Sequence, residues 1–234
     1  MLSFEHKFIF FENQKCASSS ICSYLLNFID VEEEKRLAPT SLSDIVSRHQ
    51  YIYDKHVKNE REILLWRDGH WSPRKYRSVF KKRLADVPFK CFGVVRNSWD
   101  RVASAYFHLK TIPEEGEFTI VGQMQRKVKK FKDFNEFCSN INCDPLFQKG
   151  HFSPQLNFYK AGIVPTFFIH LDSITTEIPF FMRRLTGRFV EWDGSYLNKS
   201  ERPNKDYRKL YSSSSKKIIK EKYSSDIEAF GFDF

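Results

Sequence analysis

Two hydrophobic runs along the chain are each followed by a polar turn and then by apolar residues at helical spacing. Residues 7–11 (KFIFF) and 89–95 (FKCFGVV) are nearly continuous apolar runs with the length of a buried strand. After the first run, apolar positions recur every three or four residues over 18–29, and after the second they do so from 99 to about 108. The pattern therefore predicts two strand–turn–helix units.

The C-terminal half repeats this alternation of strand and helix. Residues 167–170 (FFIH) predict a strand, and residues 174–185 predict a helix that Gly187 is suited to end. A second long helix is expected over 213–230. Strands that alternate with helices are typical of an α/β fold with a mostly parallel sheet, whose ligands bind at the C-terminal edge of the strands.

Other segments have weaker patterns. Residues 31–62 are charged and predict a loop with one helix near 43–51, and residues 63–66 (ILLW) predict a short strand. Residues 111–130 contain a PEEG sequence and a basic run, and are expected to form a polar, mobile excursion. The basic run, 126–130, is suited either to an acidic acceptor or simply to solvent.

Length and charge narrow the class of protein. A chain of 234 residues is expected to form one domain, 1–234, and the 41% hydrophobic content indicates a globular protein. Lysine and arginine exceed the acidic residues by nine, which favours an anionic partner such as a nucleic acid, an acidic glycan, a phosphorylated cofactor or a membrane surface.

The cysteines and the apolar segments indicate neither a metal site nor a membrane span. The five cysteines are odd in number and contain no CxxC pair, so free thiols in a reducing compartment are expected and no metal ligands are assigned. No secretory h-region or apolar stretch of about 18 residues is present, and the first strand begins near residue 7. We therefore expect a cytoplasmic protein without a membrane span.

Each of the two strand–turn–helix units offers a possible anion site. Lys15 precedes a hydroxyl-rich helix start, and Arg96 directly follows the second strand. A helix N-terminus next to a cation binds anions readily, so two sites suggest a ligand with two separated phosphate-like groups. The simpler alternatives are a helix capped by serine and a surface ion pair between Arg96 and Asp100. The loop lacks the glycines of the Walker pattern, which argues against an ordinary kinase.

The two turns resemble the donor-binding motifs of sulfotransferases. The segment 15–20 (KCASSS) resembles their 5′-phosphosulfate loop, and 95–106 (VRNSWDRVASAY) is similar to their 3′-phosphate motif. Segments 151–155 (HFSPQ) and 207–232, which ends in FGF, resemble the carbohydrate branch that includes the 2-O-sulfotransferases. Two departures are Ser98, where the family usually has proline, and Ala17, where cytosolic members have glycine.

The resemblance implies a fold, a reaction and a donor. The fold would be P-loop NTPase-like, with a central parallel sheet and helices on both faces in three layers. The donor would be 3′-phosphoadenosine 5′-phosphosulfate (PAPS), and a sulfuryl group would pass in line to an acceptor hydroxyl, leaving 3′-phosphoadenosine 5′-phosphate (PAP). A sulfuryl group carries less charge than a phosphoryl group, so no metal is required. The acceptor is expected to be a glycan.

The resemblance also assigns roles to individual residues. Lys15 would neutralise charge on the leaving oxygen, and Arg96 and Ser104 would hold the 3′-phosphate. Ser200 and Arg202 lie where related enzymes fold a loop over the nucleotide. The remaining residues of the 5′-phosphosulfate loop are Cys16, Ala17, Ser18, Ser19 and Ser20.

The acceptor hydroxyl needs a general base, which is usually histidine near neutral pH. The segment 69–72 (GHWS) is similar to the one that carries the base in 2-O-sulfotransferases, so His70 is the candidate. Alternatively, His70 is a loop histidine that stacks on Trp71 without a catalytic role. His56 and His49 are the next candidates for the general base. His151 is expected to shape the acceptor side.

Three other classes of function remain open at this point. A nucleotide or small-molecule kinase would bind ATP with Mg²⁺, and a basic nucleic-acid-binding domain would lose affinity steeply with salt. A protein that binds the donor without catalysis is the third. No RNA- or DNA-binding motif is present in the sequence.

Overall fold

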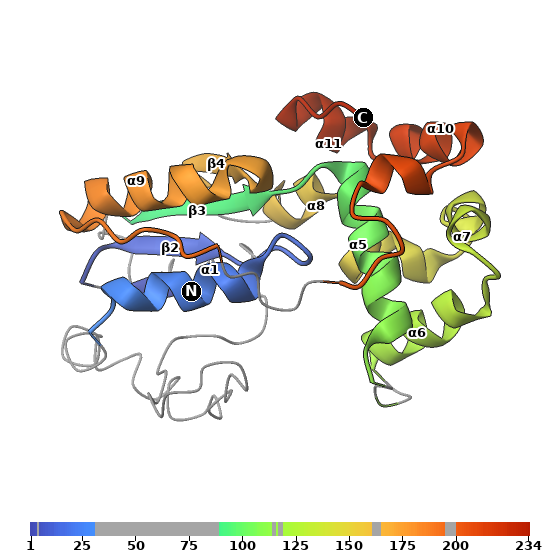
Figure 1. Ribbon diagram of the computed structural model, residues 1–234, viewed down its shortest axis with the longest axis horizontal. Coiled ribbons are helices and arrows are strands. Elements are labelled where there is room, and N and C mark those ends of the chain that lie inside the picture. The colour runs from blue at the N-terminus through green and yellow to red at the C-terminus, as the bar shows by residue number, and fades with distance from the viewer. Residues whose placement is uncertain (4, 31–88, 114–115, 117–118, 161–164, 195–199) are drawn as a thin grey trace. The chain divides into compact units, whose positions relative to one another are not determined.

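The computed structural model describes most of the chain as two compact units (Figure 1). The described residues are 1–3, 5–30, 89–113, 116, 119–160, 165–194 and 200–234. The first unit takes its residues from 1–13, 17–94 and 159–197, and the second from 14–16, 95–158 and 198–234. The helix expected near 43–51 and the strand expected at 63–66 lie outside the described residues. The single domain stays a prediction.

The first unit contains a small sheet. In the described residues its strands follow the order β1 (Leu2–Ser3), β2 (Phe8–Phe11), β3 (Lys90–Val95) and β4 (Phe167–His170). β1 is antiparallel to β2, and β2 is parallel to β3. All four side chains of β2 are buried, as its continuous apolar run predicts. The three predicted strands are confirmed.

Two helices of the first unit follow these strands in the chain. α1 (Ser18–Leu25) continues into the short 3-10 helix η1 (Leu26–Phe28), and α9 (Ile174–Thr186) follows β4 and the 3-10 helix η4 (Leu171–Ser173). α9 packs on the sheet through Phe181, whose ring centroid lies 4.9 Å from that of Phe92 and 4.3 Å from that of Phe167. Gly187 ends α9 in the left-handed conformation at φ 73°, as predicted. The result is an α/β arrangement, and its three-layer form stays a prediction.

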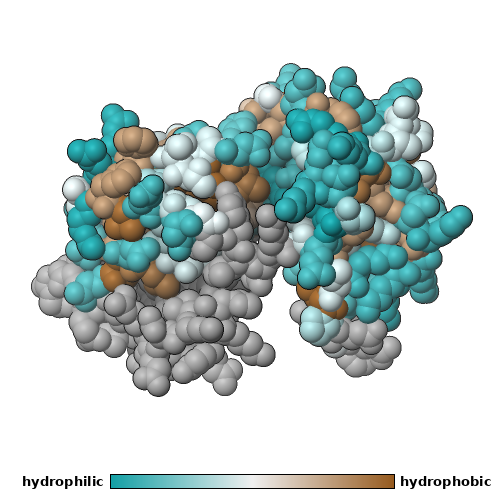
Figure 2. Space-filling view, viewed as in Figure 1, coloured by the Kyte–Doolittle hydropathy of each residue, from teal (hydrophilic) through white to brown (hydrophobic). Residues whose placement is uncertain are grey.

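The second unit is helical and has an aromatic core. Its helices are α5 (Ser98–Thr111), α6 (Ile120–Lys130), α7 (Phe134–Asn140), the start of α8 (Gln155–Lys160), α10 (Ser213–Lys222) and α11 (Ser224–Phe230), with the 3-10 helices η2 (Pro145–Gln148), η3 (Gly150–Phe152) and η5 (Tyr207–Leu210). Trp99 and Tyr106 of α5 pack in one cluster with Phe137, Phe147 and Phe152. The face of this unit seen in Figure 2 is mostly hydrophilic, which agrees with an apolar core inside.

The prediction of a polar, mobile excursion over 111–130 was wrong, because α6 forms there. Thr119 caps the helix by accepting a hydrogen bond from the Gly122 N–H at 2.9 Å. Met124 and Val128, one turn apart, are fully buried in the core of the unit. Basic side chains surround this narrow apolar stripe and hide its helical period in the overall polarity.

The helix expected over 213–230 is two helices. α10 ends at Lys222, and Tyr223, at φ −108° and ψ 23°, separates it from α11. The Tyr223 hydroxyl is buried and donates to the Phe152 carbonyl at 2.7 Å. A tertiary contact of this kind, made by a single side chain, leaves no trace in helical periodicity.

The start of α1 also differs from the prediction that a serine caps it. The N-cap residue is Ala17, whose backbone is left-handed at φ 57°, and its side chain makes no capping bond. Ser18 is the first helical residue, and its hydroxyl donates to the Asn13 carbonyl at 2.7 Å. The hydroxyl therefore holds the preceding turn instead of the helix end.

We expect that Ser98→Pro raises the melting temperature. Ser98 is the first helical residue of α5, where proline is favoured because this N–H makes no bond inside the helix. Asn97, at ψ 128°, lies outside the α region that a following proline disfavours. The smaller entropy of the unfolded chain is worth about 0.4–1 kcal/mol, or roughly 1–4 °C, in a thermal unfolding experiment.

Ser98→Ala is the control for this prediction. The Ser98 hydroxyl is buried and makes no hydrogen bond among the described residues, so its removal alone has a favourable contribution. The proline variant is expected to exceed the alanine variant. A melting temperature at or below that of Ser98→Ala would show that the turn does not accept proline.

Candidate functional site

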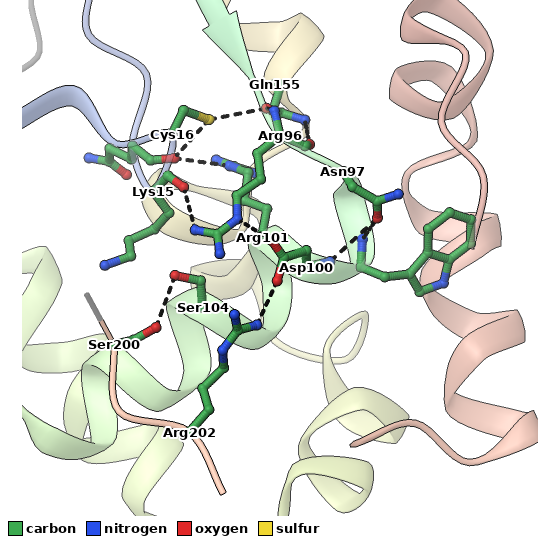
Figure 3. Close-up of polar contacts among 12 residues, drawn as sticks. Lys15, Cys16, Arg96, Asn97, Asp100, Arg101, Ser104, Gln155, Ser200 and Arg202 are labelled. Atoms are coloured by element: carbon green, nitrogen blue, oxygen red, sulfur yellow. Dashed lines mark hydrogen bonds and ion pairs between the residues drawn. The ribbon is translucent and has the colours of Figure 1, made fainter. Parts of the chain in front are cut away.

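Two arginines hold the segment that contains Lys15 against the start of α5 (Figure 3). The Arg96 Nη1 donates to the Lys15 carbonyl at 2.9 Å, and its Nε donates to Asp100 Oδ2 at 2.7 Å. The Arg101 Nε donates to the Gln14 carbonyl at 3.0 Å. Both arginines bind backbone carbonyls, so they fix the path of the chain beside Lys15 as well as contributing charge.

The backbone of this segment is strained. Lys15 at φ 63° and Ala17 at φ 57° adopt the left-handed conformation that usually belongs to glycine. Such conformations cost on the order of 1–3 kcal/mol each and persist only where surrounding contacts hold them. The hydrogen bonds from Arg96 and Arg101 supply such contacts, so the loop is tightly turned although it contains no glycine.

The Lys15 amine lies in a positive environment. Burial, followed by the positive charge of Arg96 and then that of Arg101, lowers the pKa of Lys15 to about 7. The amine is thus only partly protonated near neutral pH when no anion is bound. An anionic group beside it would raise the pKa again, so binding of a polyanion is expected to be coupled to proton uptake.

We expect the Lys15 pKa to make folding stability depend on pH. The folded pKa is about 7 and the unfolded pKa about 10.5, so between these values the unfolded chain binds more protons. The Lys15 contribution to the free energy of unfolding therefore rises with pH over that window, and the full penalty applies below pH 7. Urea unfolding at about pH 7 and pH 9.5 measures this rise in the free energy of unfolding, and Lys15→Met is the reference protein that lacks the Lys15 contribution. An equal rise in the free energy of unfolding in wild type and Lys15→Met would contradict the lowered pKa of Lys15.

Asp100 joins Arg96 to a residue far along the chain. The Arg202 Nη1 lies 2.5 Å from Asp100 Oδ1, while Arg96 occupies the other carboxylate oxygen. Burial acts to raise the pKa of Asp100, but the Arg96 and Arg202 guanidiniums together hold it below its usual range. The Arg96–Asp100 side chains are 13% and 14% exposed, so the ion pair is present and largely buried instead of on the surface.

Two hydroxyls lie in the same region of the second unit. Ser104, two turns into α5 from Arg96, has its Oγ 3.2 Å from the Oγ of Ser200. Arg202 follows Ser200 by two residues and binds α5 through Asp100. Arg96 and Ser104, which are expected to hold the 3′-phosphate, thus lie in the same region as Ser200 and Arg202, which are expected in a loop over the nucleotide. Guanidinium and hydroxyl groups are the donors that bind phosphate in proteins.

The remaining predicted site residues fall into three groups. Cys16 lies in the second unit beside Lys15, while Ala17, Ser18, Ser19 and Ser20 belong to the first unit at the start of α1. Ser18 and Ser20 are buried, and Ser19 is partly exposed. His70, with the alternatives His49 and His56, lies outside the described residues.

The Cys16 thiol is structural. Its Sγ donates to Gln155 Oε1 at 3.2 Å, and burial raises its pKa to about 11, so it stays protonated at neutral pH. Its interaction with Gln155 links the Lys15 segment to α8.

Sequence reasoning gave no role to Arg101 or Gln155. Arg101 is 2% exposed, and besides Gln14 it binds the Ser153 carbonyl through Nη1 at 2.8 Å. A buried arginine that binds only carbonyls of distant segments has no signal in sequence beyond its place in a motif. The Arg96–Asp100 pair, in contrast, is visible in the sequence as an i, i+4 spacing.

A neutral histidine lies near the Lys15 charge. Burial and then the charge of Lys15 lower the pKa of His108, on α5, to about 4. Its ring centroid is 5.9 Å from that of His151, which is buried in η3. Both rings therefore belong to the second unit together with the cationic cluster.

The described part of the chain contains neither a cluster of metal-binding side chains nor a membrane-spanning helix. Histidine, cysteine and carboxylate side chains form no group of three suited to a metal there. Among the same residues, no helix has the length and apolar character required to cross a bilayer.

The cluster of guanidinium, ammonium and hydroxyl groups in an α/β protein defines a site suited to a phosphorylated or sulfated ligand. The family model described as "Sulfotransferase family" matches residues 1–233. The chain therefore belongs to the sulfotransferase family and is a transferase of sulfuryl groups. Neither a curated protein nor a solved structure gives a significant match to it.

Proposed function

We propose that this sulfotransferase uses PAPS as donor and transfers its sulfuryl group to a hydroxyl of a carbohydrate. The observation that carries the donor assignment is the cluster formed by Arg96, Ser104, Ser200 and Arg202 around Asp100. These residues come from segments about 100 positions apart in the sequence, yet they present donors to one region of the second unit. A terminal phosphate monoester is the ligand that such donors favour.

The two ends of the donor have separate proposed ligands. Arg96 and Ser104, with Ser200 and Arg202, would hold the 3′-phosphate. Asp100 occupies only some of the guanidinium N–H groups, because each arginine has five donors. The 5′-phosphosulfate would be held by the segment of Lys15, Cys16, Ala17, Ser18, Ser19 and Ser20, mainly through hydroxyls and backbone N–H groups.

Lys15 and His70 are the proposed catalytic residues. The donor, when bound, supplies the sulfuryl group, and the acceptor oxygen forms a bond to sulfur as the bridging S–O bond breaks. His70 would take the proton from the acceptor hydroxyl. The Lys15 ammonium would stabilise the negative charge on the leaving oxygen of the nucleotide, and Arg96 holds the Lys15 backbone in place. No step of this scheme needs a metal.

Two segments support a carbohydrate acceptor. The segments 151–155 and 207–232 resemble the carbohydrate branch, and in the structure they bind each other: Tyr223 donates to the Phe152 carbonyl at 2.7 Å. A lipid or another small alcohol as acceptor is distinguished by screening acceptors with labelled PAPS.

The donor assignment is tested by calorimetric titration with PAP in the absence of Mg²⁺. Wild type is expected to bind with micromolar affinity. Arg96→Ala removes charge-assisted hydrogen bonds worth about 1.5–3 kcal/mol, so binding weakens by roughly 10- to 150-fold. Arg208→Ala is the matched control, because Arg208 is in the same unit, is 54% exposed and pairs only weakly with Asp206 at 3.7 Å.

Three results would contradict the proposal. If wild type binds ATP with Mg²⁺ and not PAP, a kinase-like function replaces it. Binding to nucleic acid that falls steeply with salt, without PAP binding, indicates a nucleic-acid-binding domain. Equal losses in Arg96→Ala and Arg208→Ala would show that PAP recognises net charge instead of the Arg96 site.

A further inference from the structure

One buried amide connects the two segments that carry Lys15 and Arg96. The Gln155 side chain is fully buried at the start of α8 (Figure 3). Its Oε1 accepts hydrogen bonds from the Arg96 N–H at 2.9 Å and from the Cys16 thiol at 3.2 Å. Its Nε2 donates to the Arg96 carbonyl at 2.8 Å. The Arg96 backbone therefore fixes which end of the amide faces which partner, since an N–H needs an acceptor and a carbonyl needs a donor.

A buried carboxylate holds Gln155 in turn. Asp226 lies on α11 and is fully buried. Its Oδ2 accepts from the Gln155 N–H at 2.7 Å and its Oδ1 accepts from the Leu156 N–H at 2.9 Å. Burial raises the pKa of Asp226, while these two N–H bonds oppose the rise. Asp226 thus uses both oxygens to fix the first turn of α8.

The contacts run in one series from the C-terminal helix to the cationic residues. Asp226 fixes the backbone of Gln155, the Gln155 amide fixes Arg96 and Cys16, and Arg96 binds the Lys15 carbonyl. A series that served only to fill the core needs no polar atoms, because burying polar groups is unfavourable unless each is paired. Here hydrogen bonds of one amide reach both segments of the proposed donor site.

We propose that Gln155 and Asp226 are positioning residues that set the spacing between the Lys15 segment and Arg96. This inference rests on the proposed function, in which these two segments bind opposite ends of one nucleotide. A misplacement of about 1 Å between groups that act on one ligand is enough to reduce the rate by about 100-fold. The effect of Gln155 and Asp226 on donor binding is therefore indirect, through the residues that touch the donor.

Two substitutions break the series at different points. Gln155→Met keeps the length of the side chain but removes the partners of the Arg96 N–H and carbonyl. Asp226→Asn keeps the shape but turns an amide NH₂ toward one of the two backbone N–H groups of α8. The matched control is Gln148→Met, because Gln148 is an exposed glutamine of the same unit, and its Oε1 accepts a hydrogen bond from Lys222 at 2.8 Å.

The rate of cysteine alkylation tests these hydrogen-bond contacts without an activity assay. Cys16 is 1% exposed and binds Gln155, Cys138 is buried in the core of the same unit, and Cys143 is exposed. Both substitutions are expected to speed iodoacetamide labelling of Cys16 by about tenfold or more, since this is the effect of losing about 1.4 kcal/mol of local stability. Cys138 stays protected in every variant, and Cys143 reacts in all of them and calibrates the reagent.

The same proteins are then titrated with PAP. Gln155→Met and Asp226→Asn are expected to weaken PAP binding by about tenfold or more, while Gln148→Met stays within about twofold of wild type. In turnover assays with PAPS, the two variants raise KM for the donor and lower kcat together, because both Lys15 and Arg96 are displaced.

Separate outcomes overturn separate statements. Failure of wild type to bind PAP removes the proposed donor, and Cys16 labelling still decides whether the series holds the Lys15 segment. If Cys16 stays protected in both variants, Gln155 and Asp226 do not hold the Lys15 segment. Faster Cys16 labelling with unchanged PAP affinity overturns the positioning role, and so does equal exposure of Cys16 and Cys138, which would mean that the whole unit has unfolded.

Discussion

Lys15→Met is expected to lower kcat for sulfuryl transfer by about 10²–10³-fold, the loss typical of removing one donor that stabilises developing negative charge. In the proposed mechanism negative charge grows on the bridging oxygen of the nucleotide, and the Lys15 ammonium is the group placed to meet it. Burial, Arg96 and Arg101 lower its pKa to about 7 when no anion is present. The donor would restore the proton, so the full charge is available when the S–O bond breaks.

Single-turnover rates and PAP titration separate the effect of Lys15→Met on the chemical step from its effect on nucleotide binding. The chemical step is expected to slow far more than PAP binding weakens, because PAP retains the contacts of Arg96 and Ser104. Lys149→Met is the control, since Lys149 is an exposed lysine of the same unit. A Lys15→Met enzyme with kcat within about threefold of wild type would remove Lys15 from the catalytic residues.

His70→Ala is expected to lower turnover by about 10²–10⁴-fold, as the loss of a general base does, and to leave PAP binding unchanged. A histidine with an ordinary pKa near 6.5 is mostly neutral at physiological pH and accepts a proton efficiently. His70 is assigned from the GHWS segment and lies outside the described residues, so the kinetic test is decisive for it.

His108 is a poor candidate for the general base. His108 lies near the Lys15 charge, and burial and that charge lower its pKa to about 4, which makes it a weak base at neutral pH. His170→Ala, at the end of β4, is the control that tests for nonspecific effects. If His70→Ala keeps more than about a tenth of wild-type turnover, the assignment fails and His56 and His49 become the variants to measure.

Local elements were predictable where one signal dominated. The strands β2, β3 and β4 are short apolar runs, and helices α1, α5 and α9 have a wide apolar face, so periodicity alone identified them. α6 was missed because Met124 and Val128 are the only large apolar side chains of this helix that are fully buried, while most of the positions around them are basic or polar. The break at Tyr223 was missed because a tertiary hydrogen bond causes it.

In the candidate site, the sequence motifs predicted individual residues, but they did not predict the contacts between distant residues. The residues Lys15, Arg96 and Ser104 follow from the motifs, and Arg96–Asp100 follows from helical spacing. The bond from Arg96 to the Lys15 carbonyl joins positions 81 apart in the sequence, and the one from Arg202 to Asp100 joins positions 102 apart. Periodicity carries no information about such pairs, because it reports only on neighbours within a few turns.

The sequence by itself determined the alternation of strands and helices, the two cationic turns and the resemblance to sulfotransferases, because each of these depends on residues close together in the chain. Only the tertiary structure decided that Arg96 and Arg202 share Asp100, that Ser104 meets Ser200 and that Gln155 and Asp226 hold the Lys15 and Arg96 segments. The physical reason is that buried polar groups must find partners, and packing selects those partners from distant parts of the chain.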